Sequence, residues 1–263
     1  MCSLLLSACP KRLATDVEAP EDMPRPNAPG RVLKAGCDQR SSRRTRAVIL
    51  PDEMAPQKSW FTIDGQLDPI EFDGPSFFRF PMELAEFVIE RFSNPDAVVL
   101  DPFCGFGTSV VAAQALGRVG IGLEHDEKHF RFAADRVKPP SRVIQGDALR
   151  IAHYEFPPAD LIFTSPPYTS FREWTDDGFA HYWQDFEAIF VSLQARLKPS
   201  GRLVVELSNV RDQDGTIRPV AFHGARILAN HYAFVGEYAR CNTGEEQAGP
   251  GFDHAHLLEY ALR

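Results

Sequence analysis

The stretch Asp160–Tyr168 reads DLIFTSPPY, and it decides how the rest of the chain is interpreted. The apolar run Leu161-Ile162-Phe163 predicts a short buried strand. Two consecutive prolines end that strand, because proline fixes its own φ angle and cannot continue the hydrogen bonding of a sheet. A hydroxyl group, on Ser165, and an aromatic ring, on Tyr168, belong to the resulting stiff turn. This combination predicts a site that grips a flat molecule.

Apolar strands alternate with amphipathic helices on both sides of this stretch. The alternation predicts an α/β fold with a doubly wound, mostly parallel, seven-stranded sheet. Residues 1–58 are rich in Pro, Arg and Ala without a sustained period. They therefore predict a disordered tail that precedes one domain at residues 59–263. Besides 160–163, the predicted strands are 97–101, 119–123, 142–145, 203–207, 233–238 and 256–262.

The charge of the chain is negative and unevenly distributed. The formal net charge is −8, yet residues 1–58 hold ten Lys and Arg against seven Asp and Glu, whereas the remainder holds 18 against 29. Proteins that bind duplex DNA tightly usually present a basic face. Tight, unaided duplex binding is therefore not expected of the main domain.

Cysteine usage and hydropathy indicate the compartment. The five cysteines are widely spread and form no C-x-x-C pair, which argues against a disulfide framework and a zinc site. No apolar run approaches the roughly 20 residues that span a bilayer. Leu6-Ser7-Ala8-Cys9 resembles a lipoprotein cleavage site, but no Lys or Arg precedes it. We expect a cytoplasmic protein with no membrane segment and no bound metal.

Polar residues and glycines follow directly after the predicted strands. Asp101 and the pair Gly105-x-Gly107 follow the first, Glu124 the second, Asp147 the third and Ser165 the fourth. In a doubly wound sheet ligands bind at the carboxyl ends of the strands, so these residues are expected to share one site. Glycines let the backbone approach a ligand closely. A carboxylate such as Glu124 can accept two hydrogen bonds from a ribose diol.

A nicotinamide dinucleotide would use the same glycines and the same carboxylate. Two features argue against it. Val110 stands where the third glycine of G-x-G-x-x-G belongs. Asp101 would repel a pyrophosphate, whereas it could hold the ammonium group of a sulfonium amino acid, directly or through water.

Four motifs together resemble a known family. They are FPMELA at 80–85, DPFCGFGT at 101–108, IGLEHD at 121–126 and TSPPY at 164–168. This set resembles the class I S-adenosylmethionine-dependent amino-methyltransferases of the DNA N4-cytosine/N6-adenine group, with the cofactor motifs before the catalytic one. The resemblance extends from about Trp60 to Arg263. It implies a Rossmann-like methyltransferase domain and S-adenosyl-L-methionine as cofactor.

The resemblance assigns the cofactor contacts to the first three motifs and to the end of the third strand. His125 and Asp126 are interpreted as flanking residues rather than ligands. The implied contacts are Phe80 and Pro81 at the methionine end, Asp101, Phe103, Gly105, Gly107 and Thr108 around the amino-acid moiety, Glu124 at the ribose, and Asp147 with Ala148 at the adenine.

The catalytic motif of the family matches Ser165, Pro166, Pro167 and Tyr168. The hydroxyl group of Ser165 and the carbonyl of Pro166 can accept hydrogen bonds from an exocyclic amine and hold its lone pair toward the methyl donor. The ring of Tyr168 can stack on a base extruded from its duplex. Cys104 is interpreted as a packing residue. In this family serine at the first position goes mainly with cytosine N4, whereas Asp or Asn goes with adenine N6 or guanine N2.

The expected function is therefore transfer of a methyl group to a base amine in DNA, with cytosine N4 favoured over adenine N6. An RNA amino-methyltransferase is the main alternative, because the chain is short and acidic. A catalytically silent, cofactor-binding partner of a larger assembly is the third. Only the loops 169–180 and 243–254 remain for target contact, the first carrying Phe171, Arg172 and Trp174. An auxiliary protein or an oligomer is thus a candidate source of target recognition.

Overall fold

The computed structural model describes residues 59–74, 79–167, 176–211, 215–243 and 254–263. The predicted tail at 1–58 lies outside the described residues. The same holds for Tyr168 and for most of the two loops predicted to contact the target.

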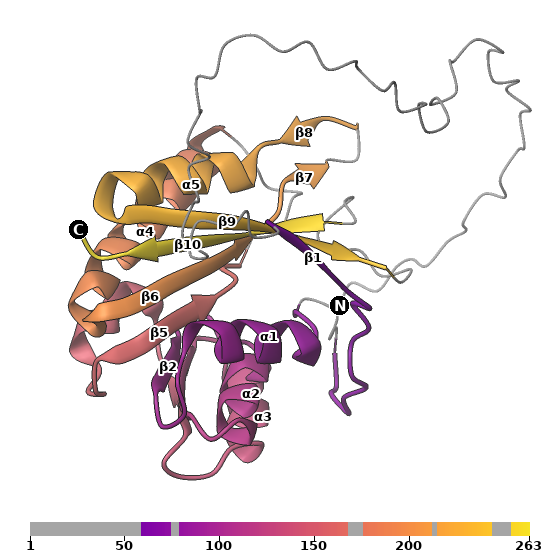
Figure 1. Ribbon diagram of the computed structural model, residues 1–263, viewed down its shortest axis with the longest axis vertical. Helices are drawn as coiled ribbons and strands as arrows, with labels where there is room; N and C mark the ends of the chain where they lie inside the picture. The colour runs from indigo at the N-terminus through magenta and orange to yellow at the C-terminus, as the bar shows by residue number, and fades with distance from the viewer. Residues whose placement is uncertain (1–58, 75–78, 168–175, 212–214, 244–253) are drawn as a thin grey trace, which may run out of the picture. The chain divides into compact units, whose positions relative to one another are not determined.

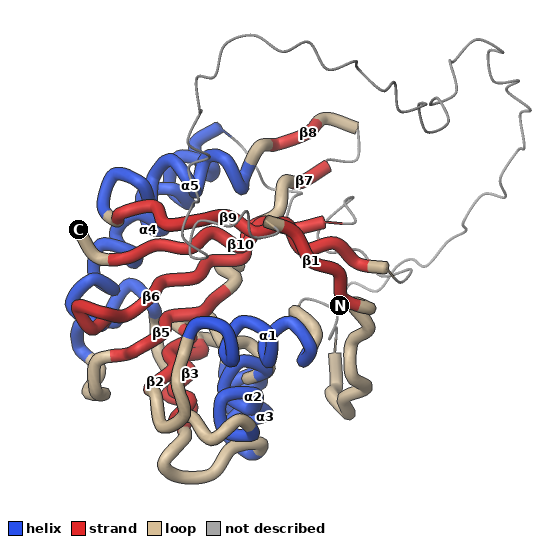
Figure 2. The backbone as a smooth tube through the Cα atoms, in the orientation of Figure 1, coloured by secondary structure: helices blue, strands red, loops and turns tan. Residues whose placement is uncertain are grey.

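The centre of the fold is an eight-stranded sheet with the order β1-β9-β10-β6-β5-β2-β3-β4 (Figures 1 and 2). Strands β2 to β6 pair in parallel, whereas β10 is antiparallel to both β6 and β9. The predicted α/β fold with a mostly parallel sheet is confirmed. The strands are β1 (Trp60–Ile63), β2 (Val98–Asp101), β3 (Val119–Glu124), β4 (Arg142–Gln145), β5 (Ala159–Thr164), β6 (Leu197–Leu207), β9 (Ala233–Asn242) and β10 (His254–Ala261).

Two predictions about the strands were wrong. Among the described residues the sheet has eight strands rather than seven, because β1 adds in parallel to the far edge of β9. Strand β6 begins at Leu197 rather than at residue 203, since Leu197 already pairs with Ala159 of β5 before a register shift. A separate two-stranded pairing joins β7 (Val210–Arg211) to β8 (Ile217–Arg218) just after β6.

The helices begin and end where local chemistry favours it. Pro81 lies directly before α1 (Met82–Phe92), where its missing N–H costs nothing. Gly117, with φ of +74°, follows the end of α2 (Thr108–Ala115). Asp126 accepts hydrogen bonds from two backbone N–H groups at the start of α3 (Glu127–Asp135). The other long helices are α4 (Asp176–Leu193) and α5 (Val220–His231).

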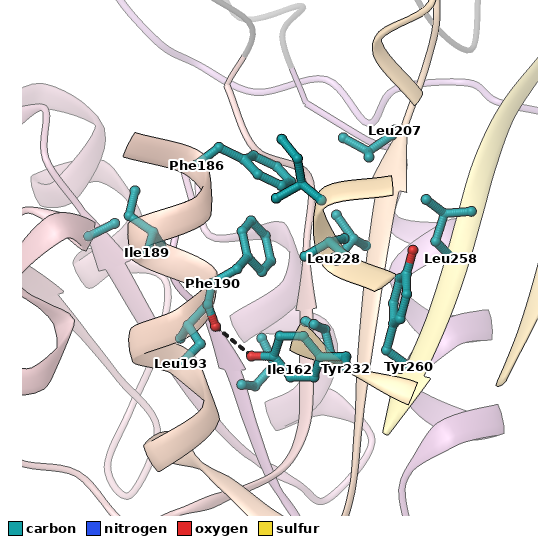
Figure 3. Close-up of a cluster of buried hydrophobic side chains, with 14 of the residues drawn as sticks. Ile162, Phe186, Ile189, Phe190, Leu193, Leu207, Leu228, Tyr232, Leu258 and Tyr260 are labelled. Carbon is teal, nitrogen blue, oxygen red and sulfur yellow. Dashed lines mark hydrogen bonds between the residues drawn. The ribbon is translucent and has the colours of Figure 1, made fainter. Parts of the chain in front are cut away.

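Alternate residues of the sheet face two separate apolar cores. Leu161 and Phe163 of β5 pack with α1 and α2, whereas Ile162 packs with α4 and α5 on the other face. In the second core the hydroxyl group of Tyr232 donates to the carbonyl oxygen of Phe190 at 2.6 Å (Figure 3). This two-sided packing confirms the doubly wound arrangement. Within the described ranges, no helix has the length and apolar character to cross a membrane.

Candidate functional site

The parallel strands β2, β3, β4, β5 and β6 all end at the same edge of the sheet. Residues predicted from separate motifs therefore lie at neighbouring strand ends. Asp101 ends β2, Glu124 ends β3, and Ser165 follows β5. Asp147 follows β4 after one glycine. This edge is the candidate functional site.

The loop after β2 carries two glycines with left-handed backbone. A Cβ atom added at Gly105, with φ of +51°, would meet nothing within 4 Å, so the loop faces open space there. A Cβ atom at Gly107, with φ of +78°, would lie 2.9 Å from the Cβ atom of Ala133 in α3. Gly105 therefore leaves room beside the loop, and Gly107 allows the loop to pack against α3.

Glu124 holds this loop against the end of β3. Its Oε2 atom accepts a hydrogen bond from the backbone N–H of Gly105 at 2.8 Å, and its Oε1 atom accepts one from the N–H of Asp126 at 2.8 Å. The carboxylate thus lies directly beside Gly105. Since each carboxylate oxygen has two lone pairs, further acceptor capacity remains for a diol.

Asp101 is a buried junction rather than an exposed acid. Its side chain is 2% exposed, and it accepts hydrogen bonds from the hydroxyl groups of Ser109 and Thr164 and from the backbone N–H of Phe103. Burial raises its pKa from 3.8 to about 6, although these hydrogen bonds oppose the shift. The predicted contact of Asp101 with an ammonium group stays a prediction. What the geometry provides is a bond of 2.6 Å from Thr164 that ties the end of β5 to the glycine loop.

The turn after β5 lies beside this loop. Pro166 is buried, Pro167 is exposed, and the half-buried Ser165 hydrogen-bonds through its side chain to the carboxylate of Glu206. The ring of Phe80 lies 5.0 Å from that of Phe163 between centroids. The predicted cofactor segment before α1 therefore packs on the strand that carries the turn.

The end of β4 completes the edge. The backbone N–H of Gly146 donates to the carbonyl oxygen of Glu124 at 2.8 Å. Asp147 accepts from the N–H of Leu149 at 2.9 Å and begins a 3-10 helix in which Ala148 is buried. The two residues predicted to contact adenine thus lie next to the residue predicted to contact the ribose.

The side chain of Cys104 packs beneath this edge. Its side chain is buried, and burial raises the pKa of its thiol. A Cβ atom on Gly122 would approach its Sγ atom to 2.6 Å. The thiol thus fills a space that a glycine in β3 leaves open.

Four polar residues at this edge were not predicted as site residues: Ser109, Thr164, Glu206 and Arg240. Glu206 and Arg240 form a buried ion pair with 2.8 Å between Oε1 and Nη2. One signal could have indicated Glu206, though not its partner: Glu206 is a charged residue inside the apolar strand segment Leu203–Leu207. Ser109 and Thr164 gave no comparable signal, because both residue types are common in loops and at helix starts.

Residues 43–135 match a family model of the N6/N4 group that is described as DNA methylase. The chain is also similar to curated proteins. It is 40% identical over 85 residues to the type II methyltransferase M.HinfI of Haemophilus influenzae, which is 31% of this chain and 24% of that protein. It is 36% identical over 66 residues to the type II methyltransferase M.SmaI of Serratia marcescens, which is 25% of this chain and 23% of that protein. The chain thus spans about a quarter of the length of these relatives. The predicted resemblance to the N4-cytosine/N6-adenine amino-methyltransferases is confirmed.

A solved structure is similar in fold. The glycopeptide N-methyltransferase MtfA superposes with a TM-score of 0.50 at 14% identity, over 69% of this chain and 90% of that one. The likeness confirms the Rossmann-like methyltransferase fold.

Proposed function

We propose that this protein transfers a methyl group from S-adenosyl-L-methionine to an exocyclic base amine in DNA, with cytosine N4 as the favoured target. The observation that carries the proposal is the bond of 2.6 Å from Thr164 to Asp101. It joins the start of the glycine loop to the residue directly before Ser165. A methyl donor held by the loop would therefore lie beside the Ser-Pro-Pro turn.

The residues at the edge fit this cofactor. The space beside Gly105 admits a ligand, and the adjacent carboxylate of Glu124 suits a ribose diol. Asp147 and Ala148 at the next strand end are the proposed adenine contacts. Phe80, packed on Phe163, is the proposed neighbour of the methionine end. Phe103, Gly107, Thr108 and Pro81 complete the proposed cofactor set.

The bound cofactor supplies an electrophilic methyl group on a sulfonium sulfur. The chain itself has to position the amine and exclude other geometries. Ser165 and the carbonyl group of Pro166 would accept hydrogen bonds from the two amine hydrogens and turn the nitrogen lone pair toward the methyl group. Pro167 stiffens the turn, and Tyr168 is proposed to stack on the base. No covalent intermediate with the protein is needed.

DNA is the proposed polymer because the matched family model is that of a DNA methylase and the curated relatives are named type II methyltransferases. The target base would leave its duplex to reach a turn that is this close to the sheet edge. Serine rather than Asp or Asn at position 165 supports cytosine N4. Target recognition by an auxiliary protein or an oligomer belongs to the same proposal, since the domain is acidic.

The test is to incubate the purified protein with methyl-labelled cofactor and separate pools of DNA and RNA, followed by nucleoside mass spectrometry. N4-methylcytosine in DNA is expected. Ser165→Ala should lower the rate roughly a hundredfold, as removal of a positioned hydrogen-bonding group does in other enzymes. Ser192→Ala is the matched control, because the hydroxyl group of Ser192 donates to the carbonyl of Ala188 within α4.

Each of the other possible outcomes would correct one part of this proposal. N6-methyladenine as the product would replace cytosine by adenine. Label found only in RNA would overturn the choice of DNA. Unchanged methylation by Ser165→Ala would remove the catalytic assignment of the turn.

A further inference from the structure

A chain of polar residues, buried at its centre, continues from Ser165 across the sheet, away from the glycine loop. Its members are Ser165 after β5, Glu206 in β6, and Arg240 and Asn242 in β9. Glu206 and Arg240 are 5% and 2% exposed. The guanidinium of Arg240 also donates from Nη1 to Oδ1 of Asn242 at 2.8 Å. None of these contacts is needed to hold the cofactor proposed above.

The register of the sheet explains how distant residues meet. Thr164 is paired with Val205, which places Ser165 beside Glu206. Phe163, Val204 and Tyr238 pack in the α1 and α2 core. Because side chains alternate along a strand, Ser165, Glu206 and Arg240, each two residues further on, face the same side.

Arg240 reaches Glu206 across the intervening strand β10. The residue of β10 opposite Arg240 is Ala255, and the residue opposite Glu206 is Leu257. Ala255 is fully buried and has only a methyl side chain. The arginine side chain therefore has room to cross β10, where a larger residue would block it.

Two opposing effects act on the charge of Glu206. Burial, the larger effect, raises the pKa of its carboxyl, whereas the ion pair with Arg240 and the hydrogen bond from Ser165 oppose that rise and favour the charged form. A buried carboxylate is retained only when it is paired and hydrogen-bonded. As an ionised carboxylate Glu206 can only accept, so the hydroxyl hydrogen of Ser165 is directed to it.

We propose that Glu206, held by Arg240, is a positioning residue that fixes the Ser165 hydroxyl as an acceptor toward the target base. The hydrogen of the hydroxyl group points to Glu206, which leaves the oxygen lone pairs for an amine N–H. A hydroxyl group without this partner could instead donate to a carbonyl oxygen. The pair thus selects amino-bearing bases over keto bases at the same position. This inference rests on the proposed function.

The test is a double-mutant cycle between Glu206→Gln and Ser165→Ala, measured as kcat and KM with the methylated polymer. A glutamine can turn its amide N–H₂ toward Ser165 and compete for the lone pairs. We expect Glu206→Gln to lower kcat roughly tenfold to a hundredfold, with the cofactor Kd from calorimetry changed less than about twofold. In the Ser165→Ala background, Glu206→Gln should lower kcat further by less than about twofold, because Glu206 acts through Ser165.

Glu259→Gln is the matched control. Glu259 is a buried acid of β10 that pairs with Arg202 at 3.2 Å, toward the opposite end of β6. The Glu259→Gln variant should keep kcat within about twofold of the wild-type value. Arg240→Lys, which keeps the positive charge, should retain more activity than Arg240→Gln. If circular dichroism shows that Glu206→Gln does not fold, the double variant Glu206→Gln/Arg240→Gln replaces it in the same cycle. The double variant leaves no unpaired buried charge.

Four results would overturn the inference. Fully additive losses of Glu206→Gln and Ser165→Ala would show that Glu206 does not act through Ser165. An equal loss of cofactor affinity and of kcat, or an equal loss of kcat in Glu259→Gln, would indicate a general structural role. Wild-type protein that methylates neither polymer refutes the proposed function and this inference with it, whereas active wild type with additive variants refutes the inference alone.

Discussion

Asp101 should make the folded protein less stable as the pH rises from about 4 to about 6. Its folded-state pKa is about 6 because of burial, compared with an ordinary value of 3.8. Between these values the folded chain retains a proton that the unfolded chain has released, so rising pH favours the unfolded state. A shift of about two pKa units at about 1.4 kcal/mol each corresponds to roughly 3 kcal/mol in the free energy of unfolding. Below pH 4 both states are protonated, and the stability attributable to this proton is fully present.

The assay is urea unfolding of wild type and of Asp101→Asn at intervals from pH 3.5 to pH 7.5. Other acids titrate in both proteins, so the difference between the two curves isolates Asp101. We expect wild type to lose roughly 3 kcal/mol relative to the variant across this range. Thr164→Val removes a donor that lowers the pKa of Asp101, so it should move the window to higher pH. Parallel curves for wild type and Asp101→Asn would refute the assignment of a buried, shifted carboxyl.

Three further predictions concern the glycine loop and the second core. Gly107→Ala should lower the free energy of unfolding by about 2 kcal/mol, because φ is +78° and the new methyl group would meet Ala133. Gly105→Ala should cost only about 1 kcal/mol in thermal unfolding yet weaken cofactor binding in calorimetry, since its methyl group enters open space; equal cofactor affinity would contradict this. Tyr232→Phe should cost about 1 to 2 kcal/mol in urea unfolding, because the buried carbonyl of Phe190 loses its hydroxyl partner; an unchanged midpoint would show that the bond contributes little.

The interior of the fold could be predicted from the sequence because its strands are apolar runs with helices between them. Strand β1 could not, because it lies at the edge of the sheet and only Ile63 of its four residues is buried. It also pairs with β9 far along the chain, Trp60 opposite Ala239. The start of β6 was missed for a related reason: Pro199 and Gly201 suggest a break, but the pairing of Leu197 with Ala159 overrides local preference.

The candidate site was partly predictable for a physical reason as well. Parallel strands end at one edge, so acids that follow strands gather there whatever their partners. Which acid faces a ligand and which lies beneath the loop depends on neighbours in space. Asp101 and Glu124 look alike in sequence, yet Asp101 is 2% exposed and bonded to Ser109 and Thr164. The pairing of Glu206 with Arg240 depends on strand order, which no local pattern encodes.

Strand order also explains what holds the Ser-Pro-Pro turn in place. Strand β5 lies between β2 and β6, and each neighbour supplies a buried carboxylate. Thr164 donates to Asp101 of β2, and the next residue, Ser165, hydrogen-bonds to Glu206 of β6. The prolines that follow have no N–H with which to extend the backbone ladder. Two side-chain hydrogen bonds to flanking strands therefore fix the turn, and both depend on carboxylates whose pKa burial raises.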